Sequence, residues 1–147
     1  MGAAFVQVFR VAHGEFDTAG EASSKIKAVL KKLGISPAVV RDVAIAAFES
    51  EMNLIIHSVG GTISLEVTPQ EVILVSEDSG PGIADIALAL TEGYSTAPES
   101  VRNLGFGAGM GLPNIRRHSH FFHIESELGK GTRIEAKYYL NGASGTM

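Results

Sequence analysis

The spacing of apolar residues predicts one strand and two helices in the first part of the chain. Residues 4–12 are rich in Val and Phe without helical spacing, which is typical of a strand. A first helix is expected after a cap at Asp17 or Thr18. A second helix is expected to begin at Pro37 and to run to about His57, with the Gly60-Gly61 pair ending it. Its buried side is expected to carry Val39, Val43, Ala46, Ala47, Ser50 and Leu54.

The rest of the chain predicts a sheet and shorter helices. Alternating apolar residues indicate a half-buried strand at 62–67, and a continuous apolar run indicates a buried strand at 72–75. The later elements are expected to be a turn at 80–82, a short helix at 83–90, a loop at 91–109, a helix at 110–118 and a hairpin of strands at 121–126 and 132–139, followed by a disordered tail at 141–147. We therefore expect one α+β domain over residues 1–147. It should be a two-layer sandwich whose sheet is mixed but mostly antiparallel, with about three helices on one face.

Composition excludes several classes of protein. The chain is 45% hydrophobic and 19% charged, which argues against disorder. Its net charge is −4 and it has no basic run, so we expect no nucleic-acid partner. It has no cysteine and no apolar run of the roughly 18 residues that a membrane span requires. A cytoplasmic protein with no membrane partner is the expectation.

Glu49 and Asn53 lie four residues apart, so they share one stripe of the second helix, with His57 one turn further. One interpretation is a solvated helix face. The other is a metal-phosphate centre, because Mg²⁺ prefers oxygen ligands and a carboxylate one turn earlier can reach an acceptor hydroxyl. His57 is expected to be a residue that packs at, or caps, the helix end.

Asp78 follows a buried strand and precedes Gly80 and Gly82. This segment can be an ordinary turn. It can equally be a nucleotide site, because a carboxylate accepts a hydrogen bond from an exocyclic amine and the glycines allow close approach to a flat ring.

Alternating glycines precede the predicted helix at 110–118; they are Gly105, Gly107, Gly109 and Gly111. Successive backbone N–H groups before a helix can hold a phosphate, although a merely flexible loop has the same composition. The run does not have Rossmann spacing, and no Walker loop is present because the Gly-Lys-Gly-Thr segment at 129–132 lacks the upstream glycine at the required spacing. Arg102 can reach a phosphate or lie in solvent.

Gly129-Lys-Gly131-Thr132 most simply turns a hairpin. The neighbouring His118, His120 and His123 suggest a metal site, but strand alternation would separate their side chains.

Four segments discussed above follow one another along the chain in a recognisable order. They are Glu49-Ser-Glu-Met-Asn53, Asp78-Ser-Gly-Pro-Gly82-Ile83, Gly105-Phe-Gly-Ala-Gly-Met-Gly111-Leu112 and Gly129-Lys-Gly131-Thr132. In this order they resemble the N, G1, G2 and G3 boxes of the Bergerat-type (GHKL) ATPases. The match is most similar to the anti-sigma-factor serine/threonine kinase branch, which is RsbT-, RsbW- and SpoIIAB-like, and covers about residues 36–139.

The resemblance implies a role for each matching residue. Glu49 would be the catalytic carboxylate, which orients or deprotonates the attacking hydroxyl, and Asn53 would ligate Mg²⁺. Asp78 would read adenine, with Thr132 at the adenine edge. The remaining cofactor-binding positions are Gly80, Gly82, Ile83, Gly105, Gly107, Gly109, Met110, Gly111 and Leu112.

The resemblance also implies a function. The expected protein is an ATP- and Mg²⁺-dependent serine/threonine kinase that phosphorylates a STAS-like antagonist or scaffold protein in a partner-switching pathway. A sigma factor or a downstream phosphatase would be a further partner, and relatives of this type often form homodimers. The alternatives are an ATP-gated anti-sigma binding module with weak catalysis and a stand-alone histidine-kinase-like ATPase domain.

Overall fold

A computed structural model of the chain describes residues 5–14, 16–57, 59–80, 82–83, 90 and 111–140. The elements in chain order are β1 (Phe5–Ala12), the short 3₁₀ helix η1 (Phe16–Thr18), α1 (Glu21–Lys32), α2 (Pro37–His57), β2 (Gly60–Val67), β3 (Glu71–Asp78), α5 (Gly111–Arg117), β4 (Phe121–Glu127) and β5 (Gly131–Tyr139). The loop predicted at 91–109 and the tail at 141–147 lie outside the described residues. So does the helix predicted at 83–90, apart from its two end residues.

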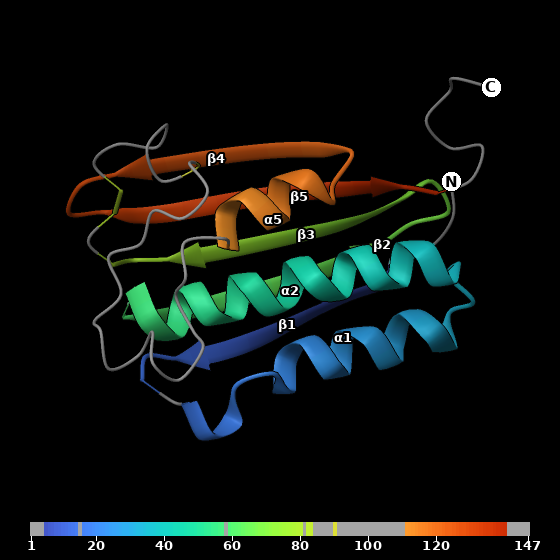
Figure 1. Ribbon diagram of the computed structural model, residues 1–147, viewed down its shortest axis with the longest axis horizontal. Coiled ribbons are helices and arrows are strands. Elements are labelled where there is room, and N and C mark those ends of the chain that lie inside the picture. Colours follow the sequence, from blue (N-terminus) through green and yellow to red (C-terminus); the bar gives the residue numbers. More distant parts are fainter. Residues whose placement is uncertain are drawn as a thin grey trace.

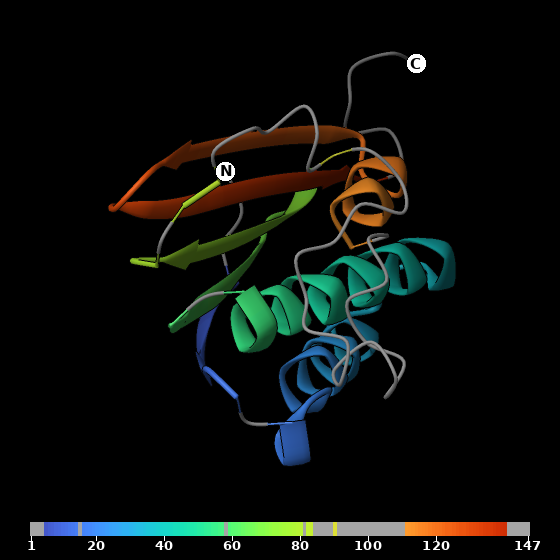
Figure 2. The same cartoon turned by 60° about the vertical axis from the view of Figure 1, so that its left-hand side comes forward.

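The five strands form one sheet in the order β1-β2-β3-β5-β4, and all four neighbouring pairs are antiparallel. The sheet is therefore antiparallel over the described residues, and the mixed alternative is wrong there. Helices α1, α2 and α5 cover one face of the sheet (Figures 1 and 2). This arrangement confirms the expected α+β sandwich with three helices on one face.

The core lies between the sheet and the helices, because each strand turns every second side chain toward the helical layer. In β3 the buried positions are Val72, Leu74 and Ser76, and α2 contributes the positions predicted for its buried side, with Val39 only half-buried. The largest fully buried side chains come from both layers: Ile26, Leu30, Leu54, Ile55, Ile63, Leu65, Ile115 and Tyr138.

Helix α1 begins later than the sequence predicted. Asp17 and Thr18 belong to η1, and the N-cap of α1 is Gly20, which has a φ of 97° and no capping side chain. The cap comes from α2 instead: the buried Glu51 carboxylate accepts hydrogen bonds from the backbone N–H groups of Ala22 and Ser23, both at 3.2 Å. A cap supplied from a residue distant in sequence cannot be found by local pattern.

We expect Glu51→Ala to lower the free energy of unfolding by about 2–3 kcal/mol, because it leaves two buried N–H groups of α1 without their charged acceptor. Urea unfolding followed by circular dichroism measures the change. Glu21→Ala is the matched control: this exposed carboxylate in the first turn of the same helix should contribute less than about 1 kcal/mol. Equal losses in the two variants would contradict the cap.

Helix α2 ends at His57, as the sequence predicted, but the Gly60-Gly61 pair begins β2 instead of ending the helix, which corrects that part of the prediction. Gly61 pairs with Asp78 of β3, and any Cβ on Gly61 would collide with the carbonyl oxygen of Glu77. The glycine is required there by the close approach of two strands.

Tyr138 is fully buried, and its hydroxyl has no hydrogen-bond partner within the described part of the chain. Burial raises the pKa of Tyr138 above its usual value of 10.0, and the Asp42 carboxylate raises it further. The folded protein therefore keeps this proton after the unfolded chain has lost it. The contribution of the protonated Tyr138 to the free energy of unfolding is complete below about pH 10. It is lost as the pH rises toward the pKa of Tyr138 in the folded state.

Tyr138→Phe removes this titration, so we expect the variant to lose less stability than the unsubstituted protein between about pH 9 and pH 11. Urea unfolding across that range measures the difference. Parallel pH dependences for the two proteins would contradict the assigned burial of the hydroxyl.

Candidate functional site

Glu49 and Asn53 lie on the side of α2 that faces the first turn of α5. A Cβ built on Gly111, the first residue of α5, would lie 3.3 Å from Asn53 Oδ1 and 3.4 Å from Glu49 Oε1. Both side chains are half-buried, so they do not form a fully solvated helix face. Because residue 111 is a glycine, a space remains beside the Glu49 carboxylate and the Asn53 amide. The methyl group of an alanine would fill this space.

Asn114 of α5 orients the carboxylate. Its Nδ2 donates to Glu49 Oε2 at 3.2 Å, whereas the other carboxylate oxygen, Oε1, lies beside Gly111. The two oxygens of Glu49 therefore have different surroundings, one engaged by an amide and one directed at the α5 N-terminus. Sequence reasoning missed Asn114, although it stands one turn after Gly111 in the same glycine-led segment.

Asp78 ends β3 on the helix-covered face, because it shares the alternation of the buried Leu74 and Ser76. Its Oδ1 accepts a hydrogen bond from the backbone N–H of Gly80 at 2.8 Å. This contact confirms the turn. The turn and the nucleotide interpretation remain compatible, because a carboxylate has a second oxygen that can accept another donor.

Thr132 lies directly beside Asp78, since the two residues pair across β3 and β5. Thr132 also pairs with Ser126 of β4, and their hydroxyl oxygens are 2.8 Å apart. Ser126 Oγ accepts a hydrogen bond from the backbone N–H of Ile83 at 2.7 Å. The chain after Asp78 is thus tied to the β4–β5 hairpin, whose predicted turn at 129–132 is confirmed by Gly129 with a φ of 80°. Ser126 was not singled out from the sequence, because only the strand register places it in this row.

These two groups of residues lie at the same end of the molecule. Asn53 is one turn before the end of α2, and the chain then enters β2, where Gly61 pairs with Asp78. The C-terminal ends of α2 and β3 and the N-terminal end of α5 point to the same side in Figure 1. The described residues therefore bring Glu49, Asn53 and Gly111 together, and separately Asp78, Thr132 and Ile83, at one end of the helix-covered face.

The structure assigns no contact with these two groups to the other predicted site residues that follow. Leu112 is half-buried and packs against the hydrophobic core. Gly105, Gly107, Gly109, Met110 and Arg102 lie outside the described residues. The side chain of His57 also lies outside them.

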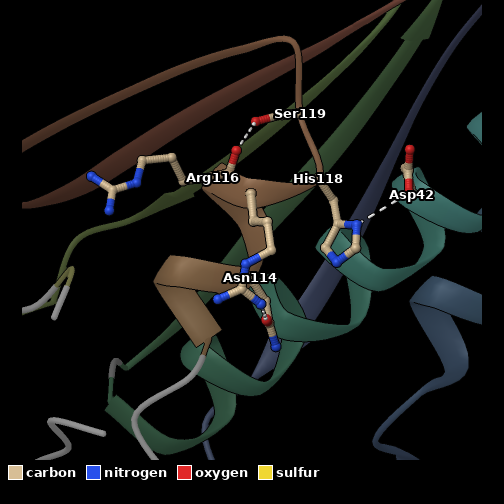
Figure 3. Close-up of polar contacts among 6 residues, drawn as sticks. Asp42, Asn114, Arg116, His118 and Ser119 are labelled. Carbon is tan, nitrogen blue, oxygen red and sulfur yellow. Dashed lines mark hydrogen bonds and ion pairs between the residues drawn. The ribbon is translucent and has the colours of Figure 1, made fainter. Parts of the chain in front are cut away.

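The three histidines have separate partners and form no shared site. His118 Nδ1 lies 3.2 Å from Asp42 Oδ1 of α2 (Figure 3), His123 pairs with Glu125 at 3.1 Å, and the His120 ring stacks on Tyr139. Among the described residues, no group of three or more His, Cys, Asp or Glu could hold a metal ion. The suggested histidine metal site is wrong within that part of the chain. The His118–Asp42 contact instead ties the end of α5 to α2, as the Asn114–Glu49 contact does at its middle.

Comparison with known proteins identifies the family. Residues 39–141 match the model of the Histidine kinase-, DNA gyrase B-, and HSP90-like ATPase family. The chain is 30% identical to the serine/threonine-protein kinase RsbT of Bacillus subtilis over 116 residues, which cover 76% of this chain and 81% of that protein. It is 34% identical to the anti-sigma F factor of Clostridium kluyveri over 108 residues, which cover 70% of this chain and 72% of that protein.

Two solved structures share the fold. A chain of the SiaB-SiaC complex from Pseudomonas aeruginosa superposes with a TM-score of 0.62 at 13% identity, covering 89% of this chain and 88% of that one. The mycobacterial sensor histidine kinase MprB superposes with a TM-score of 0.54 at 15% identity, covering 92% and 98%.

The chain therefore belongs to the Histidine kinase-, DNA gyrase B-, and HSP90-like (GHKL) ATPase family. Within that family it falls in the anti-sigma serine/threonine kinase branch, which confirms the resemblance found in the sequence. Membership of an ATPase family implies use of ATP. No helix among the described residues combines the length and the apolarity that a membrane crossing requires.

Proposed function

We propose that the protein, taken as one ATP-binding domain over residues 1–147, is a Mg²⁺-ATP-dependent serine/threonine kinase that phosphorylates a STAS-like antagonist or scaffold protein. The observation that carries this proposal is the placement of Glu49 and Asn53 against the first residue of α5, at the same end as Asp78 and Thr132. The names of its relatives, a serine/threonine kinase and an anti-sigma factor, support it.

Asn53 fits the role of the metal ligand. Its Oδ1 is a hard oxygen beside the space that a Cβ on Gly111 would fill, and Mg²⁺ takes one or two protein oxygens together with phosphate oxygens. When bound, the ion neutralises charge on the transferred phosphoryl group. The backbone of the run from Gly105 to Gly111, with Met110 and Leu112, would surround the phosphates.

Asp78 and Thr132 fit the role of the purine site. The Asp78 carboxylate keeps one oxygen on the Gly80 N–H, which leaves the other for the exocyclic amine of adenine. Thr132 presents its hydroxyl in the adjacent position of the row. Gly80, Gly82 and Ile83 complete the wall, because the Ser126 hydroxyl holds the Ile83 N–H and so sets the path of this segment.

Glu49 fits the role of the catalytic carboxylate. It would accept the proton of the substrate hydroxyl, or orient that hydroxyl, while the Asn114 amide holds Oε2 and leaves Oε1 toward the phosphate end of the site. Asn114 is a positioning residue in this scheme.

The proposal includes the location and the assembly of the protein. Partner switching takes place in the cytoplasm, with a sigma factor or a phosphatase as the second partner, and the kinase acts as a homodimer.

The rival function is an ATP-gated anti-sigma binding module, which the anti-sigma F factor relatives favour. A stand-alone histidine-kinase-like ATPase is a third candidate, which is consistent with the family to which the chain belongs.

The test is incubation with Mg²⁺ and ATP labelled at the γ-phosphate, in the presence of STAS-domain proteins encoded in the same genome. We expect one of them to acquire an acid-stable phosphoserine or phosphothreonine. Binding to such a protein without label transfer would favour the binding module. Acid-labile label, or phosphate release without a partner, would favour the histidine-kinase-like alternative.

A further inference from the structure

A groove of about 610 Å³ runs between α1 and α2, away from the sheet. The α2 positions that line it recur every three to four residues, so they form a second helical stripe distinct from the buried one. Its floor is apolar and includes Ile35, Val40, Ile45 and Phe48. The stripe from Pro37 to Glu49 is about 18 Å long at the rise of an α-helix, which is enough for about three turns of a docked helix.

The rim of this groove is basic although the whole chain carries a net charge of −4. Lys27 and Lys31 of α1 and Arg41 of α2 line it, and none of the three forms an ion pair with another described residue. An apolar floor between these cations is complementary to an amphipathic segment with acidic flanks.

The groove also has a direction. Because α1 and α2 are antiparallel, Lys31 and Arg41 lie toward the connection between the two helices, and Glu49 lies toward the opposite end of the groove. Lys31 and Arg41 would hold the acidic flanks of a partner away from the Glu49 carboxylate, which would repel those flanks. The proposed catalytic carboxylate thus lies at the end of the groove opposite Lys31 and Arg41.

We infer that this groove docks an acidic, amphipathic helix of the protein substrate and thereby brings the phosphoacceptor hydroxyl to Glu49. This inference rests on the proposed kinase function for the role of Glu49. The docking itself can be measured without nucleotide, so the two can fail separately.

The experiment uses two labelled synthetic helical peptides with leucines at helical spacing, one flanked by Glu and the other by Lys. Fluorescence anisotropy with the full chain measures binding. We expect the Glu peptide to bind, and Lys27→Glu with Lys31→Glu to weaken it at least about tenfold. The same double variant should instead bind the Lys peptide. Lys25→Glu with Lys32→Glu is the matched control, because both residues are exposed on α1 and do not line the groove.

Several results would overturn the inference. They are failure of the Glu peptide to bind, equal weakening by the two double variants, and failure of the charge swap to restore binding. A shift from dimer to monomer in the Lys27→Glu/Lys31→Glu variant, measured by light scattering, would show a second copy in the groove and would also overturn it. Once a substrate protein is known, this variant should raise its KM and leave the KM for ATP unchanged. If peptide binding holds and no phosphotransfer is found, the proposed function fails and the docking groove stands.

Discussion

Glu49→Gln should reduce phosphotransfer by about 10²–10⁴-fold and leave the affinity for Mg²⁺-ATP nearly unchanged. The substitution keeps an oxygen that can accept the Asn114 Nδ2 hydrogen bond at the present 3.2 Å contact, so the packing of α5 on α2 should survive. It removes the charge that would draw the proton from the substrate hydroxyl. Single-turnover transfer of labelled phosphate measures the rate, and calorimetry measures the affinity.

Asn114→Ala is the companion variant for Glu49. It leaves the carboxylate in place but releases Oε2, so we expect an intermediate loss of rate from misorientation. If Glu49→Gln retained more than about a tenth of the rate, Glu49 would not be the acid–base residue. Phosphotransfer would then depend on a group other than the Glu49 carboxylate.

Asp78→Asn should weaken ATP binding by about 10–100-fold, which corresponds to the loss of one hydrogen bond to a charged acceptor. Either orientation of the new amide is unfavourable. Its NH₂ group would face the Gly80 N–H, which now donates at 2.8 Å, or it would face the exocyclic amine of adenine. Calorimetric titration with ATP measures the change.

Glu77→Gln is the matched control for Asp78. Glu77 is the preceding residue of β3, points to the opposite face of the sheet and lies 3.6 Å from Arg133, so its neutralisation should leave ATP affinity unchanged. Equal affinity for ATP in Asp78→Asn and the unsubstituted protein would contradict the adenine assignment.

Local periodicity predicted most of the described fold. The alternation in β2, the apolar run in β3 and the Pro37 start of α2 are properties of short segments, and the structure confirms them. The start of α1 was wrong because Glu51, 28 residues beyond Ser23, supplies the cap. Gly60 and Gly61 were misassigned because a glycine pair after a helix has the same pattern whether it ends the helix or lets two strands approach closely.

The candidate site also contains some residues that local spacing identifies and others that only long-range contacts bring together. Glu49 and Asn53 were identified together because helical spacing alone places them on one stripe. The adjacency of Asp78, Thr132 and Ser126 is a consequence of strand register, which joins segments about 50 residues apart and leaves no local signal. The basic groove could not be predicted from the sequence either, because Lys27 and Arg41 come to line one groove only when α1 packs on α2.

Hydrogen–deuterium exchange with and without Mg²⁺-ATP is the most direct test that these segments face one ligand. The account predicts slower exchange on ATP addition at the Gly80 to Ile83 segment, at Thr132 and at the first turn of α5, with one common half-saturating concentration. Protection of only one of these segments, or half-saturating concentrations that differ between them, would contradict a single nucleotide site.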